Sequence, residues 1–228
     1  MQRLHRMSTD STRLLRILHL ASPALPIGAF HFSQGLEYAV EAGWVTDEPS
    51  SLAWITGIAQ QAIGTLDLPV LLRLHRACNR GDEDGLRCWS RFLLAARETQ
   101  ELRAEDRHMG SALARILREL GAAGSSSNQT PGYAEMFAIA CVHWRIPEHE
   151  ALQAYAWTWA ENQVLCAIKL VPLGQSAGQR MLHALVPTLE GIATRAVAID
   201  DEEIGACALM QGLSSARHES QYTRLFKS

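Results

Sequence analysis

The chain has 228 residues, of which 47% are hydrophobic and 20% are charged, and its formal net charge is -3 at pH 7. This composition is typical of a folded domain with a sizeable core, and it argues against a disordered chain. The negative net charge argues against nucleic acid or an anionic membrane as a partner, since both bind basic surfaces.

The cysteines and the first residues indicate a reducing, cytoplasmic location. There are five cysteines, none of them in a Cys-x-x-Cys pair, and an odd number does not suit a disulfide framework. We interpret them as small buried apolar residues. Residues 1–10 are polar and charged, unlike a signal peptide, and no apolar run is expected to reach the length of a membrane span.

The chain is predicted to begin with a flexible arm at residues 1–10, followed by one all-helical domain over residues 11–213. Apolar side chains in residues 14–20 recur at helical spacing, and Pro23 with Pro26 ends that helix. The domain is therefore expected to start with a short amphipathic helix and a rigid loop.

A second helix is predicted over residues 33–42, with Gly43 closing it in a left-handed conformation. Residues 47–51 are typical of the next helix start, and apolar side chains then recur at helical spacing over residues 52–66. Pro69 either limits this helix or begins another.

An acidic turn at residues 81–85 precedes a long helix predicted over residues 86–120. The middle of this helix, residues 97–107, is dense in charge. We interpret it as a solvated helix face with local ion pairs, such as Arg97 with Glu101. A charged docking face for a partner is the alternative.

Residues 121–132 form the clearest break, because they combine Gly, Ala, Ser, Asn and Pro, which is typical of a flexible surface connection. The Thr-Pro pair at residues 130–131 and Pro147 are predicted helix starts. A further helix is expected over residues 175–193, kinked or joined at Pro187. Strand patterns are nearly absent, so we predict an all-α, single-domain bundle of roughly ten helices.

Motifs for catalysis are missing from the sequence. There is no phosphate-binding glycine loop, no Gly-x-Ser-x-Gly elbow and no His-Glu-x-x-His helix, and the nine histidines have no metal-ligand spacing. We therefore expect no cofactor, no resident metal and no catalytic residue. Lys169 stands inside an apolar segment, where it either extends to the surface or is a buried base.

The stretch from Pro23 to Glu37 is rich in groups suited to contacts. Its aromatic residues Phe30 and Phe32 can anchor a partner, and Ser33 can cap the helix that carries Glu37. A structured turn that packs this helix onto the core is an equal alternative.

Residues 214–228, here called the tail, combine aromatic and basic side chains. If they form a helical turn, Tyr222, Leu225 and Phe226 share one side. Aromatic and arginine residues are favoured at the energetic centres of interfaces. From these residues alone, docking on the chain's own domain and docking on another chain are both open.

Four segments in this order resemble the UreF family of urease accessory proteins. They are Ala21–Phe30 with Ser33–Glu37, Arg97–Arg103 with Met109 and Gly110, Lys169–Gln175, and His218–Ser228. The resemblance extends from about Leu14 to the last residue. Each segment is modest alone, and the series is specific.

The resemblance implies an all-α protein without catalytic activity of its own, which forms a homodimer. Such proteins join UreD (also called UreH) and the GTPase UreG on apo-urease, help to deliver nickel to the urease active site and regulate the GTPase. The tail resembles the part that UreD orders, and Phe30 and Arg224 occupy positions tied to recruiting UreG. Phe30 stands where a tyrosine is common, which leaves an aromatic anchor without a hydroxyl.

The predicted partner-binding residues come from these segments. They are Phe30, Ser33, Glu37, Lys169, Arg217, His218, Glu219, Tyr222, Arg224, Leu225 and Phe226. From their placement, Glu37 and Lys169 are expected to line a charged, partly exposed passage. Two alternatives stay open: a nickel chaperone that binds the ion directly through Cys or His, and a helical metal-dependent enzyme built from scattered histidines and acids.

Overall fold

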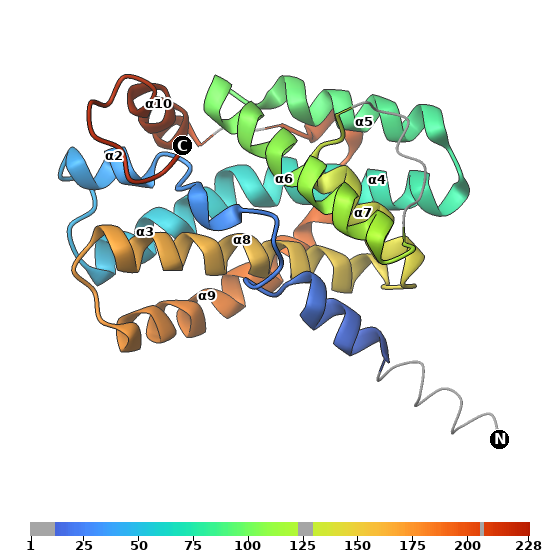
Figure 1. Ribbon diagram of the computed structural model, residues 1–228, viewed down its shortest axis with the longest axis horizontal. Coiled ribbons are helices and arrows are strands. Elements are labelled where there is room, and N and C mark those ends of the chain that lie inside the picture. Colours follow the sequence, from blue (N-terminus) through green and yellow to red (C-terminus); the bar gives the residue numbers. More distant parts are fainter. Residues whose placement is uncertain (1–11, 123–129, 206–207) are drawn as a thin grey trace.

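A computed structural model describes residues 12–122, 130–205 and 208–228, which contain helices and no β-strand (Figure 1). The all-α prediction is thereby confirmed. Residues 12–20 are helical, and the predicted arm at residues 1–10 lies outside the described residues. The further elements are the 3-10 helix η1 (Ala29–His31), α2 (Leu36–Glu41), α3 (Glu48–Ile58), the π-helical segment η2 (Ala59–Asp67), α4 (Leu68–Arg80), α5 (Glu83–Ala96), α6 (Gln100–Glu119), α7 (Tyr133–His143), α8 (Glu148–Leu170), α9 (Gln175–Ala196), the 3-10 helix η3 (Asp201–Glu203) and α10 (Leu209–His218).

The elements α3, η2 and α4 form one continuous helix from Glu48 to Arg80. Asp47 caps its start by accepting a hydrogen bond from the Ser50 amide, and Pro69 lies in the first turn of α4. By length and composition this helix could cross a membrane, which corrects the expectation that no apolar run has that length. However, 72% of its most apolar window is buried in the protein, as in the core helix of a folded domain.

The core lies between this long helix and the helices that surround it. α8 packs along α9, α4 packs against α5, α7 and α8, and α6 packs against α7 (Figure 1). Removing their apolar side chains from water is the main stabilising contribution, at roughly 25 cal/mol per Å² of buried apolar surface. Large side chains in this core that are fully buried include Leu68, Leu71, Leu72, Leu113, Met136 and Phe137.

The helix predicted over residues 86–120 is two helices, α5 and α6, separated at residues 97–99. Thr99 caps α6, because its hydroxyl accepts a hydrogen bond from the Leu102 amide. The acidic turn is also shorter than predicted, since Asp82 already caps α5. Both differences come from short polar side chains that bind the first amides of a helix.

The start of α7 at Tyr133 lies two residues beyond the predicted start at residues 130–131. The carboxylate of Asp106, on α6, accepts a hydrogen bond from the Tyr133 amide at 3.2 Å. Gly110 permits this approach, since a Cβ there would lie 2.2 Å from the Pro131 carbonyl oxygen. A neighbouring helix therefore sets where α7 begins, which local sequence does not report.

Other predicted boundaries are close to the observed ones. α8 begins directly after Pro147, and α9 continues through Pro187 as one helix. Gly43 follows α2 with a φ of 73°, the predicted left-handed conformation. Of the predicted flexible connection at residues 121–132, residues 123–129 lie outside the described residues.

The helical residues 12–20 project from the body of the molecule (Figure 1). Leu20 is buried at their base, and Arg13 forms an ion pair of 3.0 Å with Glu150 of α8. The more exposed apolar side chains of this segment are Leu14, Leu15 and Leu18.

Candidate functional site

The tail meets the other three motif segments at one end of the molecule. Its first residues complete α10, and residues 219–228 return over α2 and the turn before it (Figure 1). α10 packs against α2 and contacts α6. We call this place the tail site; it consists of the tail, residues 28–37, the beginning of α6 and the last turn of α8.

Glu37 is the central acceptor of the tail site. Its buried carboxylate accepts hydrogen bonds from the backbone amides of Leu225, at 2.6 Å, and Phe226, at 2.8 Å. Nε2 of His218 lies 3.1 Å from the same carboxylate. Hydrogen bonds to an ionised acceptor are about twice as strong as neutral ones. One side chain of α2 therefore holds the tail at two places.

His218 is fully buried between two carboxylates. Its Nε2 faces Glu37, and its Nδ1 lies 2.9 Å from Oε2 of Glu101. A neutral imidazole has one N–H, so both contacts are hydrogen bonds only when the ring or one carboxyl group carries an additional proton. Burial raises the pKa of Glu101, while the neighbouring His218 and Arg224 act to lower it. Arg224 completes the group through an ion pair of 3.2 Å with Glu101.

The last two residues run beside the turn in an extended pairing. The Lys227 amide donates to the His31 carbonyl at 2.7 Å, and the Ser33 amide donates to the Ser228 carbonyl at 2.8 Å. The Ser33 hydroxyl also donates to the Ser228 carbonyl, at 2.5 Å, and accepts from the Glu37 amide at 3.3 Å. Ser33 thus joins the first turn of α2 to the tail.

Gly35 allows α10 to approach the turn. It is the N-cap of α2, the position predicted for Ser33, and its φ of 84° is a left-handed conformation that favours glycine. A Cβ on Gly35 would lie 2.8 Å from the backbone nitrogen of Ser215. The Ser214 hydroxyl donates to the Gly35 carbonyl, and the Ser215 and Thr99 hydroxyl oxygens lie 2.8 Å apart.

The outer side of the tail is exposed, and its arrangement differs from the predicted one. Residues 221–228 contain no helix, and Phe226 is buried, whereas Tyr222 is fully exposed and Leu225 is 67% exposed. The helical turn that would place these three side chains on one side is therefore not formed, and they do not share one side. Neighbouring side chains of a non-helical segment can face opposite directions, so Phe226 packs inward while Leu225 faces solvent.

Lys169 and Phe30 form the edge of the tail site. The Lys169 ammonium lies 5.9 Å from the centre of the Phe30 ring and 5.7 Å from that of Phe226. Because Lys169 is exposed, the interpretation that it extends to the surface is confirmed over that of a buried base. Phe30 is half exposed, and Arg217 and Glu219 also lie at the surface.

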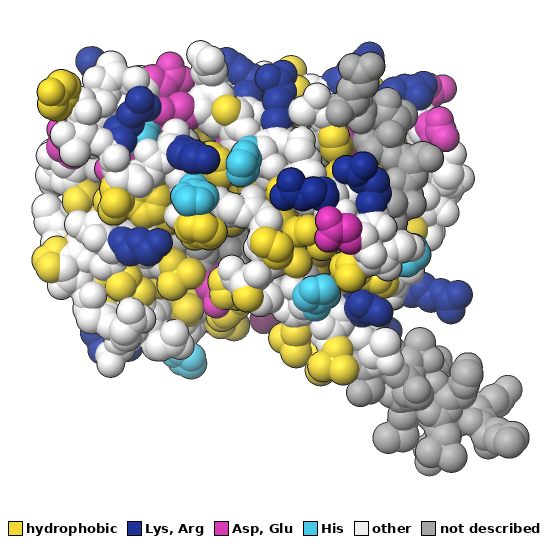
Figure 2. All heavy atoms as spheres, in the orientation of Figure 1, with side chains coloured by type: hydrophobic (Ala, Val, Ile, Leu, Met, Phe, Trp, Pro, Cys, Tyr) yellow, Lys and Arg dark blue, Asp and Glu magenta, His cyan; other side chains and the backbone are white. Residues whose placement is uncertain are grey.

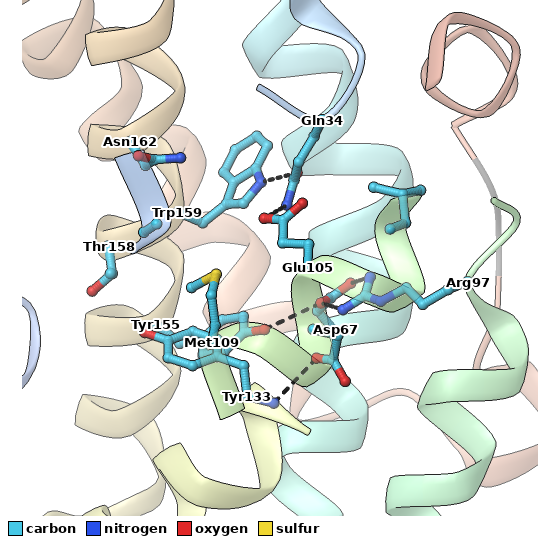
Figure 3. Close-up of a pocket in the computed structure, with 13 residues that line it drawn as sticks. Gln34, Asp67, Arg97, Glu105, Met109, Tyr133, Tyr155, Thr158, Trp159 and Asn162 are labelled. Carbon is cyan, nitrogen blue, oxygen red and sulfur yellow. Dashed lines mark hydrogen bonds and ion pairs between the residues drawn. The ribbon is translucent and has the colours of Figure 1, made fainter. Parts of the chain in front are cut away.

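A second cluster of charge lies in the core beneath the tail site (Figure 3). We call it the interior cluster; it consists of Asp67, Arg97 and Tyr155. Arg97 forms an ion pair with Asp67, with Nη2 and Oδ1 2.5 Å apart, and the Tyr155 hydroxyl donates to Asp67 at 3.3 Å. The interpretation of residues 97–107 as a solvated face is therefore wrong for the side that faces the core. Arg97 pairs across the fold rather than with Glu101, because the break before α6 turns it inward.

Glu105 links the interior cluster to the tail site. Gln34 donates to its Oε1 at 2.9 Å, and the Ser228 hydroxyl donates to its Oε2 at 3.3 Å. Gln34 in turn accepts from the Trp159 indole at 2.8 Å. Burial raises the pKa of Glu105 to about 7, although Gln34 and Arg97 act to lower it. Gln34, Glu105 and Trp159 border a cavity of about 40 Å³, which has room for ordered water (Figure 3).

The described residues show no group of three or more His, Cys, Asp or Glu side chains that could hold a metal ion. Cys141 and Cys166 are buried, but Cys88 is exposed, which corrects the prediction that the cysteines are buried. Burial raises the pKa of Cys166 to about 12. Cys207 lies outside the described residues.

Three residues in and beneath the tail site were not predicted as site residues: Gln34 lies within the segment Ser33–Glu37, Glu105 lies within the charged run at residues 97–107, and Asp67 had no signal in the sequence. Gln34 and Glu105 are 71 positions apart, and Asp67 is 30 positions from its partner Arg97. Helical periodicity relates only residues a few positions apart, so it cannot predict contacts between residues this far apart in the sequence. Glu101 did carry a signal, because it lies within one of the motif segments, but its partners are in the tail.

Comparisons with known proteins point to one family. The sequence model of the UreF family matches residues 45–186. The protein named urease accessory protein UreF from Alkalilimnicola ehrlichii is 46% identical over 228 residues, which cover 97% of this chain and 100% of that protein. Proteins of the same name from Teredinibacter turnerae and Hahella chejuensis are 43% and 42% identical, covering 96% and 94% of this chain and 100% and 98% of those proteins.

Proposed function

The chain belongs to the UreF family of urease accessory proteins, which places it in urease maturation, and from this membership we propose its specific role. It is a non-catalytic scaffold that binds UreD (UreH) through the tail and recruits the GTPase UreG to apo-urease. In this role it regulates the GTPase and helps to deliver nickel to the urease active site. Its location is the cytoplasm.

The observation that carries the proposal is the two-sided tail. Its inner side is held by buried hydrogen bonds to Glu37, while its outer side leaves Tyr222 and Leu225 exposed. Exposed aromatic and apolar side chains on a held backbone suit a protein interface, because less conformational freedom is lost when the partner binds. UreD is the proposed partner of this outer side.

Phe30 and Arg224 are the proposed contacts for UreG. Glu101 holds the Arg224 side chain, and the Lys169 ammonium lies near the Phe30 ring, so both are positioned before a partner arrives. Phe30 offers an aromatic surface without a hydroxyl, which suits an apolar anchor. Arg224 offers a guanidinium for a carboxylate of the partner.

Glu37 acts by positioning the tail rather than by lining an open passage. Both of its carboxylate oxygens already accept hydrogen bonds from tail amides. A role for Glu37 as a direct contact for nickel or for a partner would require those hydrogen bonds to break. Lys169, which is exposed, remains a direct contact in the proposal.

Co-purification with UreD and UreG, with and without residues 219–228, tests the proposed function. Residues 214–218 are kept, because they complete α10 and several of their side chains are buried. The truncated chain should retain its helical circular dichroism spectrum and lose UreD. A truncated chain that still binds UreD with undiminished affinity would contradict the proposal.

The rival functions are tested by metal binding to the isolated chain. A nickel chaperone that carries the ion itself should bind nickel stoichiometrically and tightly in a calorimetric titration. A metal-dependent enzyme should purify with a stoichiometric metal. The scaffold should do neither.

The projecting residues 12–20 are the proposed contact for a second copy of the chain. Their exposed leucines lie beside a groove bordered by α8, including Trp157. Apolar patches of this kind are typical of interfaces between chains. Leu14→Glu with Leu18→Glu should convert a dimer to a monomer in sedimentation equilibrium, and an unchanged mass would contradict this contact.

A further inference from the structure

A groove with a basic lining lies beside Phe30, between residues 26–31 and the outward face of α6. Among the described residues that line it, none is acidic. Figure 2 shows Lys, Arg and His side chains near the centre of this face, with hydrophobic side chains between them and an acidic side chain beside them. We call it the basic groove; its charged or titratable residues are His31, Arg107, His108, Arg115 and Lys227.

The cations of the basic groove are available to a partner. Arg107 and Arg115 are exposed on α6, and neither forms an ion pair with any residue that the structure describes. Slight burial and the neighbouring positive charges, that of Lys227 first, lower the pKa of His31. A local excess of positive charge lowers the pKa of a histidine, because it disfavours the charged form of the ring.

The two acidic residues of the adjoining pocket, which shares Ala104, His108 and Lys227 with the basic groove, are already engaged, whereas the exposed Glu119 lies one helical turn beyond Arg115 on α6. Glu101 is paired with His218 and Arg224 within the tail site. Glu219 accepts a hydrogen bond from the Gln100 amide at the start of α6. The groove is therefore a local concentration of positive charge on a chain whose net charge is -3.

We infer that the basic groove receives an acidic face of UreG, in addition to the contacts at Phe30 and Arg224. This inference rests on the proposed function, because Phe30 borders both the tail site and the groove. Apolar lining such as Ile27 and Phe30 between the cations suits a protein surface. Nucleic acid is the weaker candidate, since a net negative chain lacks the extended basic field that binds phosphates.

The double variant Arg107→Glu with Arg115→Glu tests the inference. Both side chains are exposed, and neither belongs to the tail site, so the fold should be retained. Surface plasmon resonance with GTP-loaded UreG at low and high salt should show affinity lower by about tenfold or more at low salt. The loss should lie mainly in the association rate and should shrink at high salt, because the attraction is screened.

A matched control is Arg80→Glu with Arg195→Glu, which changes the net charge equally at two exposed positions outside the groove. It should alter the affinity for UreG by less than about twofold, since charges beyond a Debye length are largely screened. Binding of UreD should be unchanged in both double variants.

The outcomes separate the inference from the proposed function. If the Arg107→Glu, Arg115→Glu protein binds UreG as the unmodified protein does, the inference is overturned while the proposed function stands. If the unmodified protein binds no UreG, the proposed function fails and the inference fails with it. Tighter binding of a short DNA duplex than of UreG at the same salt would also overturn the inference.

Discussion

The tail site and the interior cluster both bury carboxylates, but they hold different parts of the chain. In the interior cluster, Asp67 and Arg97 join the start of α4 to the segment before α6, within the core. In the tail site, Glu37 and Glu101 hold a segment that lies over the outside of α2. The same chemistry fixes the core in one place and seats a surface segment in the other.

This difference gives the two regions separate consequences when they are broken. Loss of one member of the interior pair leaves the other charge buried in the core, which should lower the free energy of unfolding of the whole domain. Loss of a tail contact releases a segment whose outer side is already in water, so the core should remain intact. Variants that act on one region at a time should therefore separate the two kinds of contact.

The largest effect is expected for Arg97→Met, which leaves Asp67 buried without its counter-charge. The free energy of unfolding in urea should fall by about 3 to 5 kcal/mol. The matched control is Arg76→Met, which breaks a half-exposed ion pair of 3.0 Å with Glu148. That change should cost less than about 1 kcal/mol, because solvent screens the pair. Equal losses in the two variants would remove the distinction between the interior cluster and an ordinary surface pair.

The pH dependence of stability should reveal Glu105, which lies between the two regions. Burial raises its pKa from 4.5 to about 7, so the folded state holds this proton more tightly than the unfolded chain does. Its contribution to stability is therefore complete below pH 4.5 and is lost as the pH rises to about 7. The loss should amount to at most about 3 kcal/mol.

The control for this pH dependence is Glu105→Gln, which cannot ionise and keeps the size of the side chain. The free energy of unfolding in urea should be measured between pH 5 and pH 8, roughly the range in which a carboxyl group with a raised pKa titrates. It should decrease less with rising pH in the variant than in the unmodified protein. If the free energy of unfolding changes with pH equally in the two proteins, Glu105 does not titrate in this range.

A smaller effect is expected for Gly35→Ala, and it should be concentrated in the tail. A Cβ at Gly35 would strain the left-handed backbone and meet the backbone of Ser215, whereas the control Gly43→Ala has the same kind of φ and nothing within 4 Å. Strain alone should cost each variant about 1 kcal/mol. Trypsin should cleave at Arg217 and Arg224 faster in Gly35→Ala only; equal rates would contradict the close approach of α10.

The smallest effect on stability is expected for Tyr222→Ala, because this side chain is fully exposed. The midpoint of thermal unfolding should not change. The affinity for UreD should nevertheless fall by about tenfold or more, as for an aromatic residue at the centre of an interface. A protein with unchanged UreD affinity would show that the outer side of the tail is not the contact.

Helix existence was predictable because it depends on local spacing. Apolar residues recur at helical intervals, and caps such as Asp47 and the glycine at Gly43 mark the boundaries. The break between α5 and α6 was missed because Thr99 stands within a charged run that also suits a helix. The start of α7 was missed because its capping carboxylate, that of Asp106, comes from another helix.

The candidate site was predictable in its members but not in its geometry. The motif segments include Glu37, Glu101 and His218, yet the spacing of each segment says nothing of the others. The residues alone left the destination of the tail open between its own domain and another chain. Contacts between positions 37 and 225 depend on how the helices pack, so only the folded arrangement shows that one carboxylate seats the tail.

The role of Glu37 in seating the tail is tested most directly by the affinity of UreD for Glu37→Ala, measured beside Glu41→Ala. Glu37 is buried and its carboxylate is bound to tail amides, whereas Glu41 is exposed on the same helix. We expect Glu37→Ala to weaken UreD binding by about tenfold or more, since the partner must then order the tail itself, and Glu41→Ala to have no effect. Unchanged affinity in a folded Glu37→Ala protein would contradict the claim that Glu37 seats the tail for its partner.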